Sequence, residues 1–206
     1  MAIVNFPTTL TLIRLVVSPL ILPLLLVYFL PINHILINGI LVLFFFALSL
    51  TDFFDGYLAR KYGQETLLGA VLDPIADKFL VYSTLIGLLV VNKIYFFWVV
   101  LLIGREFFLM GLRQVALENN FSVPVSFLGK LKTATQIICL MFIIFNPYQT
   151  VGLGLSGVAW WNTAELILIV ITVGISMLSA LFYYQAFIGK FLAKHESDTI
   201  VKAHKS

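Results

Sequence analysis

Long apolar runs follow one another along most of this 206-residue chain and constrain its fold more than any other feature. The hydrocarbon core of a bilayer is about 30 Å thick, so a helix that spans it needs roughly 20 apolar residues. Suitable windows, of which the fifth is shortest, lie at about 9–30, 33–58, 67–91, 94–117, 130–146 and 163–188. Helices are expected throughout, because lipid tolerates only helices or closed barrels and the period-2 alternation of a barrel is missing. The sequence therefore predicts an all-α integral membrane protein with six transmembrane helices.

The composition agrees with this fold class. Hydrophobic residues make up 61% of the chain and charged residues only 11%, whereas about a quarter of the residues in a soluble domain are charged. A soluble fold of this length cannot hide so much apolar surface, so soluble domains, nucleic-acid modules and disordered regulators are excluded. We expect one transmembrane domain over residues 1–206, with a polar cytoplasmic tail from about residue 190.

The basic residues in the connections and at the ends of the predicted spans are distributed unevenly between the two sides. One side carries eight of them, namely Arg60, Lys61, Lys130, Lys132, Lys190, Lys194, Lys202 and Lys205. The connections on the other side carry only Lys93. Short loops rich in Lys and Arg stay in the cytoplasm. The sequence therefore predicts a multi-pass protein of the cytoplasmic membrane, with both termini on the cytoplasmic side.

Acidic and small residues form two stripes at helical spacing on the second and third spans. The first stripe consists of Asp52, Asp55, Gly56, Ala59 and Arg60, at offsets 0, 3, 4, 7 and 8, and the second of Gly69, Asp73 and Asp77, at offsets 0, 4 and 8. Each set lies along one face of an α-helix. Because the two spans form an antiparallel hairpin, we expect the four carboxylates to converge in the cytoplasmic half of the membrane.

Four carboxylates at close range repel one another and need cations unless most are protonated. Oxygen ligands without His or Cys suit hard ions such as Mg²⁺, Mn²⁺ or Ca²⁺. Four Asp are enough for a two-metal site, which suits phosphoryl transfer because the ions bind both attacking and leaving oxygens. The alternatives are a proton or cation pathway, or a structural network with Arg60 and Lys78. The small residues also have an alternative role in close packing of helices.

Written out, these residues form the pattern D-x-x-D-G-x-x-A-R-x8-G-x3-D-x3-D, with eight fixed residues over 26 positions. The pattern resembles the signature of the CDP-alcohol phosphotransferases, and every signature position is met. The resemblance implies a six-helix bundle with a polar cavity open to the cytoplasm. It also implies a homodimer.

Further segments narrow the resemblance to the bacterial members of this family that use glycerol 3-phosphate. The matching segments are residues 5–14, in which Thr8 replaces the usual Asn, and residues 72–78, 104–106 and 129–133. The implied reaction transfers the phosphatidyl group of CDP-diacylglycerol to sn-glycerol 3-phosphate in phospholipid biosynthesis, giving phosphatidylglycerophosphate and CMP. Rival hypotheses are another acceptor in the same family, such as inositol phosphate, serine or choline, and a cation or proton transporter.

The resemblance also implies roles for the signature residues. Asp52, Asp55, Asp73 and Asp77 would bind two divalent cations, Mg²⁺ or Mn²⁺. Asp77 would in addition be the general base for the acceptor hydroxyl. The residues implied for the CDP-lipid site are Gly56, Ala59, Arg60 and Gly69. Membrane lipid is the expected surrounding partner, and no nucleic acid is expected.

The acceptor phosphate needs its own cations, and three basic residues are candidates. Arg105 and Arg113 are eight residues apart on one face of the fourth span, and Lys130 opens the fifth span at the same predicted level as Arg113. Arg offers phosphate a bidentate fork and Lys a point charge. Arg105 has an alternative role as a partner of Glu106 or of the Asp cluster. The alternative for Arg113 and Lys130 is an ordinary position at the membrane surface, which fits Lys132 better.

Arg14 lies one turn or more into the first span. Its side chain is expected either to contact the CDP pyrophosphate or to extend to the membrane interface.

Overall fold

The structure is a computed structural model. It describes the backbone of residues 12–62, 67–124, 127–147 and 159–203, and the side chains of these residues except 52–74, 159 and 195–203. Within these ranges the regular structure is helical, without a strand, as predicted. The chain divides into two compact units, which are described separately. One comprises Met1–Val99 with Ile137–Ile167, and the other Val100–Gln136 with Leu168–Ser206.

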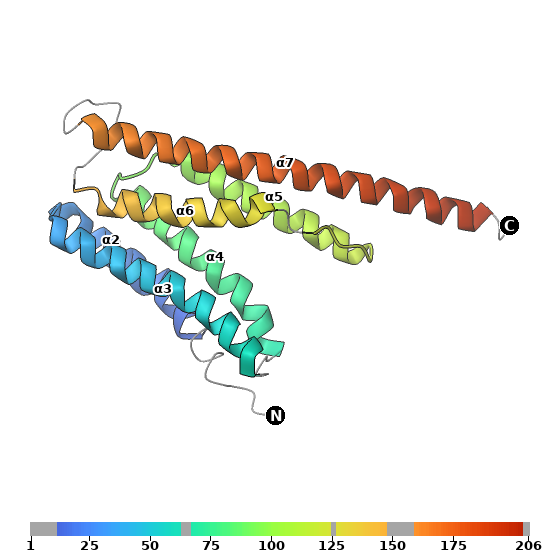
Figure 1. The fold of residues 1–206 in the computed structure, drawn as a ribbon, viewed down its shortest axis with the longest axis horizontal. Coiled ribbons are helices and arrows are strands. Elements are labelled where there is room, and N and C mark those ends of the chain that lie inside the picture. Colours follow the sequence, from blue (N-terminus) through green and yellow to red (C-terminus); the bar gives the residue numbers. More distant parts are fainter. Residues whose placement is uncertain (1–11, 63–66, 125–126, 148–158, 204–206) are drawn as a thin grey trace. The chain divides into compact units, whose positions relative to one another are not determined.

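Residues 12–16 are α-helical, and six further α-helices follow them in the described residues (Figure 1). They are α2 (Leu22–Phe29), α3 (Ile35–Tyr62), α4 (Leu67–Val90), α5 (Phe96–Glu118), α6 (Phe127–Phe145) and α7 (Ala159–Ala203). A π-helical turn η1 (Val17–Ile21) precedes α2 and a 3₁₀ turn η2 (Leu30–Ile32) follows it. These helices occur where the apolar windows predict them. The last helix is longer than its window, since its backbone stays helical to Ala203.

Three helices of the described chain are long and apolar enough to cross a membrane. They are Leu12–Ile32, Phe127–Phe145 and Trp160–Lys194. A shorter apolar stretch covers Ile35–Thr51. In α5, Arg105, Glu106 and Arg113 interrupt a largely apolar helix that ends at Glu118. Length and apolar composition thus support a membrane protein.

In the first unit, α2 packs closely on α4. A Cβ atom added to Gly87 of α4 would lie 3.3 Å from Leu26 Cδ1 and 3.4 Å from Pro23 Cα. The small residue therefore lets the two helices approach, as is common between membrane helices. Helices α3 and α4 follow each other across residues 63–66 and also pack together. This hairpin places the end of α3 and the start of α4, which carry the predicted signature, at one end of the unit.

A buried polar network lies at the opposite end of α4. The Asn146 carbonyl accepts hydrogen bonds from Lys93 Nζ at 2.7 Å and from Asn38 Nδ2 at 3.2 Å. The Asn146 side chain donates to Glu165 Oε2 at 2.7 Å. All four side chains are buried. The network ties α3, the α4–α5 connection, the end of α6 and the start of α7 together within this unit.

Lys93 makes the stability of this network depend on pH. Burial lowers the pKa of Lys93 from 10.5 to about 8, against the opposing effect of Glu165. Above about pH 8 the folded protein loses this proton before the unfolded chain does, so the contribution of Lys93 to stability rises with pH up to about pH 10.5. We expect the unfolding temperature of the wild type in detergent to rise relative to Lys93→Met between about pH 7 and about pH 10. A constant difference between the two proteins over this range would contradict the assignment.

Candidate functional site

The α3–α4 hairpin carries the predicted metal and CDP-lipid residues. Its helical backbone places Asp52 and Asp55 near the end of α3, and Asp73 and Asp77 in the first half of α4. The side chains of Asp52, Asp55 and Asp73 lie outside the described residues, as do those of four further signature positions, Gly56, Ala59, Arg60 and Gly69. The convergence of the carboxylates therefore stays a prediction.

Asp77 is the signature carboxylate whose side chain is described. It is half-buried, next to the buried Ala76. Among the side chains that the structure describes, no group of three His, Cys, Asp or Glu could hold a metal ion. The donor set predicted from the sequence consists of oxygen ligands only, which fits a hard divalent cation.

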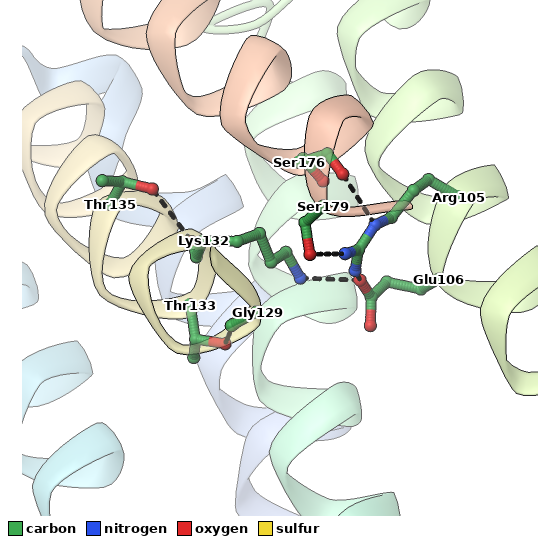
Figure 2. Close-up of polar contacts among 8 residues, drawn as sticks. All are labelled: Arg105, Glu106, Gly129, Lys132, Thr133, Thr135, Ser176 and Ser179. Carbon is green, nitrogen blue, oxygen red and sulfur yellow. Dashed lines mark hydrogen bonds and ion pairs between the residues drawn. The ribbon is translucent and has the colours of Figure 1, made fainter. Parts of the chain in front are cut away.

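Arg105 is the centre of a buried polar cluster in the second unit, between α5 and α7 (Figure 2). Its side chain is only 8% exposed. Nε donates to the Ser176 carbonyl at 3.1 Å, and Nη2 donates to Ser179 Oγ at 3.0 Å. Nη1 donates to Glu106 Oε1. A guanidinium held on three sides has a defined orientation, because each bond removes a rotational freedom of the long side chain.

Glu106 joins α5 to α6 through a second cation. Lys132 Nζ lies 2.7 Å from the same Oε1 atom that Arg105 contacts (Figure 2). The Lys132 side chain is buried, with 6% of the residue exposed. One carboxylate thus pairs with two buried cations, as charges need when they are removed from water, and the three groups keep a net positive charge.

The pairing of Arg105 with Glu106 agrees with the alternative that the sequence left open. The interpretation of Lys132 as an ordinary surface cation is wrong, because this side chain is buried and paired. A signal was available in the sequence, since Glu106 is an acidic residue inside an apolar span and needs a cationic partner. The identity of that partner depends on helix packing.

The other two candidates for the acceptor phosphate are exposed. Arg113 lies on α5, with its guanidinium carbon 5.5 Å from the centre of the Tyr183 ring on α7. Lys130 lies in the first turn of α6, two residues before Lys132. Three candidate cations therefore belong to the same unit, but only Arg105 is buried.

Arg14 is buried, with 2% of its surface exposed. A side chain that extends to the interface would keep its charged end in water, so the burial disfavours that alternative for Arg14. Contact with the CDP pyrophosphate stays a prediction.

Comparison with known proteins adds a family relationship to this geometry. The sequence model of the family described as CDP-alcohol phosphatidyltransferase matches residues 4–178. A relative from Rickettsia typhi (strain ATCC VR-144 / Wilmington) is 37% identical over 182 residues, which cover 88% of this chain and 96% of the relative. A relative from Escherichia coli (strain K12) is 38% identical over 149 residues, which cover 69% of this chain and 78% of the relative. Both relatives are named CDP-diacylglycerol–glycerol-3-phosphate 3-phosphatidyltransferase.

Proposed function

The chain belongs to the CDP-alcohol phosphatidyltransferase family, and we propose that it transfers the phosphatidyl group of CDP-diacylglycerol to sn-glycerol 3-phosphate. The products are phosphatidylglycerophosphate, an intermediate of phospholipid biosynthesis, and CMP. The observation that carries the proposal is the 37% identity to a relative of this name across 96% of the relative's own length. The buried basic cluster between α5, α6 and α7 supports it, because an anionic acceptor needs cations in an otherwise apolar bundle.

Asp52, Asp55, Asp73 and Asp77 are proposed to hold two divalent cations, Mg²⁺ or Mn²⁺. When bound, such ions neutralise the pyrophosphate of the donor and the charge that develops on the departing CMP. The helical spacing of the four residues and the short α3–α4 connection support this assignment.

Asp77 is proposed to act also as the general base. Its carboxylate takes the proton of the acceptor hydroxyl while that oxygen attacks the β-phosphorus of the CDP-lipid and the bond to CMP breaks. Gly56, Ala59, Arg60 and Gly69 are proposed to line the CDP-lipid site. Three of these four positions lack side-chain bulk, which lets a ligand approach the backbone.

Arg105, Arg113 and Lys130 are proposed to bind the phosphate of the acceptor. Arg105 has five N–H donors, and its three hydrogen bonds leave donors for an anion. Because its guanidinium is already oriented by Ser176, Ser179 and Glu106, little conformational entropy is lost when a phosphate binds. Arg113 and Lys130 are exposed, so their charged groups are accessible to a soluble substrate.

We also propose the number of membrane spans, their orientation and the oligomeric state. The apolar windows support six spans, and the basic residues of the predicted cytoplasmic side, apart from the buried Lys132, support an orientation with both termini in the cytoplasm. The polar cavity would then open to the cytoplasm, where glycerol 3-phosphate is soluble. A homodimer is proposed from the family resemblance.

The choice of acceptor is tested with purified protein in mixed micelles of CDP-diacylglycerol and Mg²⁺. Glycerol 3-phosphate, inositol phosphate and serine are supplied separately, and CMP release is measured. We expect CMP release with glycerol 3-phosphate. Release with inositol phosphate or serine, but none with glycerol 3-phosphate, would show that the acceptor is wrong while the family reaction holds.

Arg113→Ala tests the acceptor site. Removing the guanidinium removes a charge-assisted contact to phosphate, which contributes about 1.5–3 kcal/mol. We expect KM for glycerol 3-phosphate to rise by about tenfold to a hundredfold, with a smaller change in KM for CDP-diacylglycerol. Initial rates at varied concentrations of each substrate measure both constants. A larger rise in KM for CDP-diacylglycerol than for glycerol 3-phosphate would show that Arg113 belongs to the donor site.

A further inference from the structure

We propose that one face of α7 positions the acceptor site, and that Tyr183 is the positioning residue for Arg113. This inference rests on the proposed function, since it concerns the cations that would bind the acceptor phosphate. It assigns a role in acceptor recognition to the last helix, which lies outside the α3–α4 hairpin that carries the signature.

The ring of Tyr183 lies against the guanidinium group of Arg113. Its ring centre lies 5.5 Å from the guanidinium carbon, within the range of a cation–π contact. The ring itself cannot move easily, because Tyr183 is 7% exposed and belongs to an apolar cluster with Leu109 and Ala180. A buried ring under an exposed arginine restricts the positions of the arginine and leaves its N–H groups for an anion.

Several contacts of α7 with the other elements of this unit lie along one helical stripe. The residues that make them are Ser176, Ser179, Tyr183, Phe187, Lys190 and Lys194. Their spacing of three or four residues keeps them on one face of the helix. The N-terminal part of the stripe, Ser176 and Ser179, binds Arg105. The middle part, Tyr183, contacts Arg113. A single helix face therefore orients two of the three cations proposed for the acceptor phosphate.

The lower part of the stripe holds the connection between α5 and α6. The ring of Phe121 packs on Phe187 with the centres 5.5 Å apart. Lys190 Nζ donates to the Ser122 carbonyl at 2.7 Å, and Lys194 Nζ donates to the Asn119 carbonyl. The two lysines supply donors for carbonyls that follow the end of α5, where the helix dipole favours cations. The chain between Arg113 and Lys130 is thus attached to α7 at both polar and aromatic contacts.

The proposal is tested by two substitutions of Tyr183 and a matched control. Tyr183→Leu removes the aromatic face, whereas Tyr183→Phe keeps it. Tyr184→Leu makes the same change one position along α7, where the ring packs on Phe108. CMP release is measured in mixed micelles at varied glycerol 3-phosphate and varied CDP-diacylglycerol. Thermal unfolding of each variant is recorded alongside.

For Tyr183→Leu we expect KM for glycerol 3-phosphate to rise about threefold to tenfold, as when one side chain must be ordered on binding. The turnover number and KM for CDP-diacylglycerol should stay within about twofold, since the proposed role of the ring is limited to Arg113. Tyr183→Phe and Tyr184→Leu should match the wild type. If Tyr183→Leu does not fold, Tyr183→Met replaces it, because methionine fills the same space without a ring.

Introducing Tyr183→Leu into Arg113→Ala completes the test. If Tyr183 acts through Arg113, the second substitution should leave KM for glycerol 3-phosphate unchanged from that of Arg113→Ala. An equal rise in both backgrounds would overturn the positioning role, as would a Tyr183→Phe variant as impaired as Tyr183→Leu, or a Tyr183→Leu variant that matches the wild type. Failure of the proposed function looks different, because the wild type itself would then release no CMP with glycerol 3-phosphate.

Discussion

Replacing Asp77 by Asn is expected to lower the turnover number for CMP release by about 10²–10⁴-fold, the usual contribution of a general base. Asparagine has the same shape but cannot accept the proton of the acceptor hydroxyl. The amide oxygen remains available as a neutral ligand, so we expect binding of CDP-diacylglycerol to be weakened but retained. Turnover is followed by CMP release, and binding by retention of labelled CDP-diacylglycerol on the purified protein.

Asp198→Asn is the matched control, since it makes the same change in the polar end of the chain, outside the signature. It should leave turnover at the wild-type level. Wild-type turnover in Asp77→Asn would remove Asp77 as the base. Complete loss of CDP-diacylglycerol binding would instead show that its charge is needed mainly to hold the donor site.

Glu106→Gln is expected to lower the free energy of unfolding by about 3–5 kcal/mol, the usual effect of removing one partner of a buried ion pair. The glutamine keeps the shape of the side chain, but the buried cations Arg105 and Lys132 then lose the negative charge of Glu106. Chemical unfolding of the purified protein in detergent measures the change. CMP release should fall as well, because Arg105 loses one of the bonds that orient it.

Adding Lys132→Met to Glu106→Gln should recover part of this stability, because it removes one of the two buried cations that Glu106 pairs with. Glu118→Gln is the control on the same helix. Glu118 is exposed and bonds to Gln114, so its substitution should change the stability by less than about 0.5 kcal/mol. Equal effects of the two glutamate substitutions would contradict the buried cluster. No recovery in the double variant would show that Lys132 is stable without Glu106.

The helices themselves could be predicted from the sequence, because apolar length and helical spacing are local properties. The first apolar window at about 9–30 corresponds to the helical segment Leu12–Ile32. The end of α7 could not be predicted in this way. Hydropathy indicates where the apolar part of a helix ends, but it does not indicate where the helical backbone ends. The backbone of α7 stays helical to Ala203.

The partners inside the bundle could not be predicted, since they depend on how helices far apart in the sequence pack. In the sequence, Lys132 cannot be distinguished from a lysine at the membrane surface, yet its side chain is buried against Glu106. Ser179 is an ordinary small polar residue of a membrane helix until α7 brings its hydroxyl to Arg105. The sequence identified Lys93 only as the one basic residue in the connections of the predicted non-cytoplasmic side. Its burial follows from its hydrogen bond to Asn146.

The signature of the α3–α4 hairpin was predictable for a different reason. Its residues repeat at helical spacing within 26 positions, so their shared face follows without tertiary information. The family relationship reported by the comparisons agrees with that pattern.

The central claim is tested most directly by following labelled glycerol 3-phosphate into lipid. Purified protein is placed in liposomes with CDP-diacylglycerol and Mg²⁺, and label in the organic phase is compared with CMP in the aqueous phase. We predict one lipid-soluble phosphatidylglycerophosphate for each CMP released, and no product when EDTA removes the divalent cation. Ion flux through the protein without any labelled lipid or CMP would contradict the account and favour a transporter.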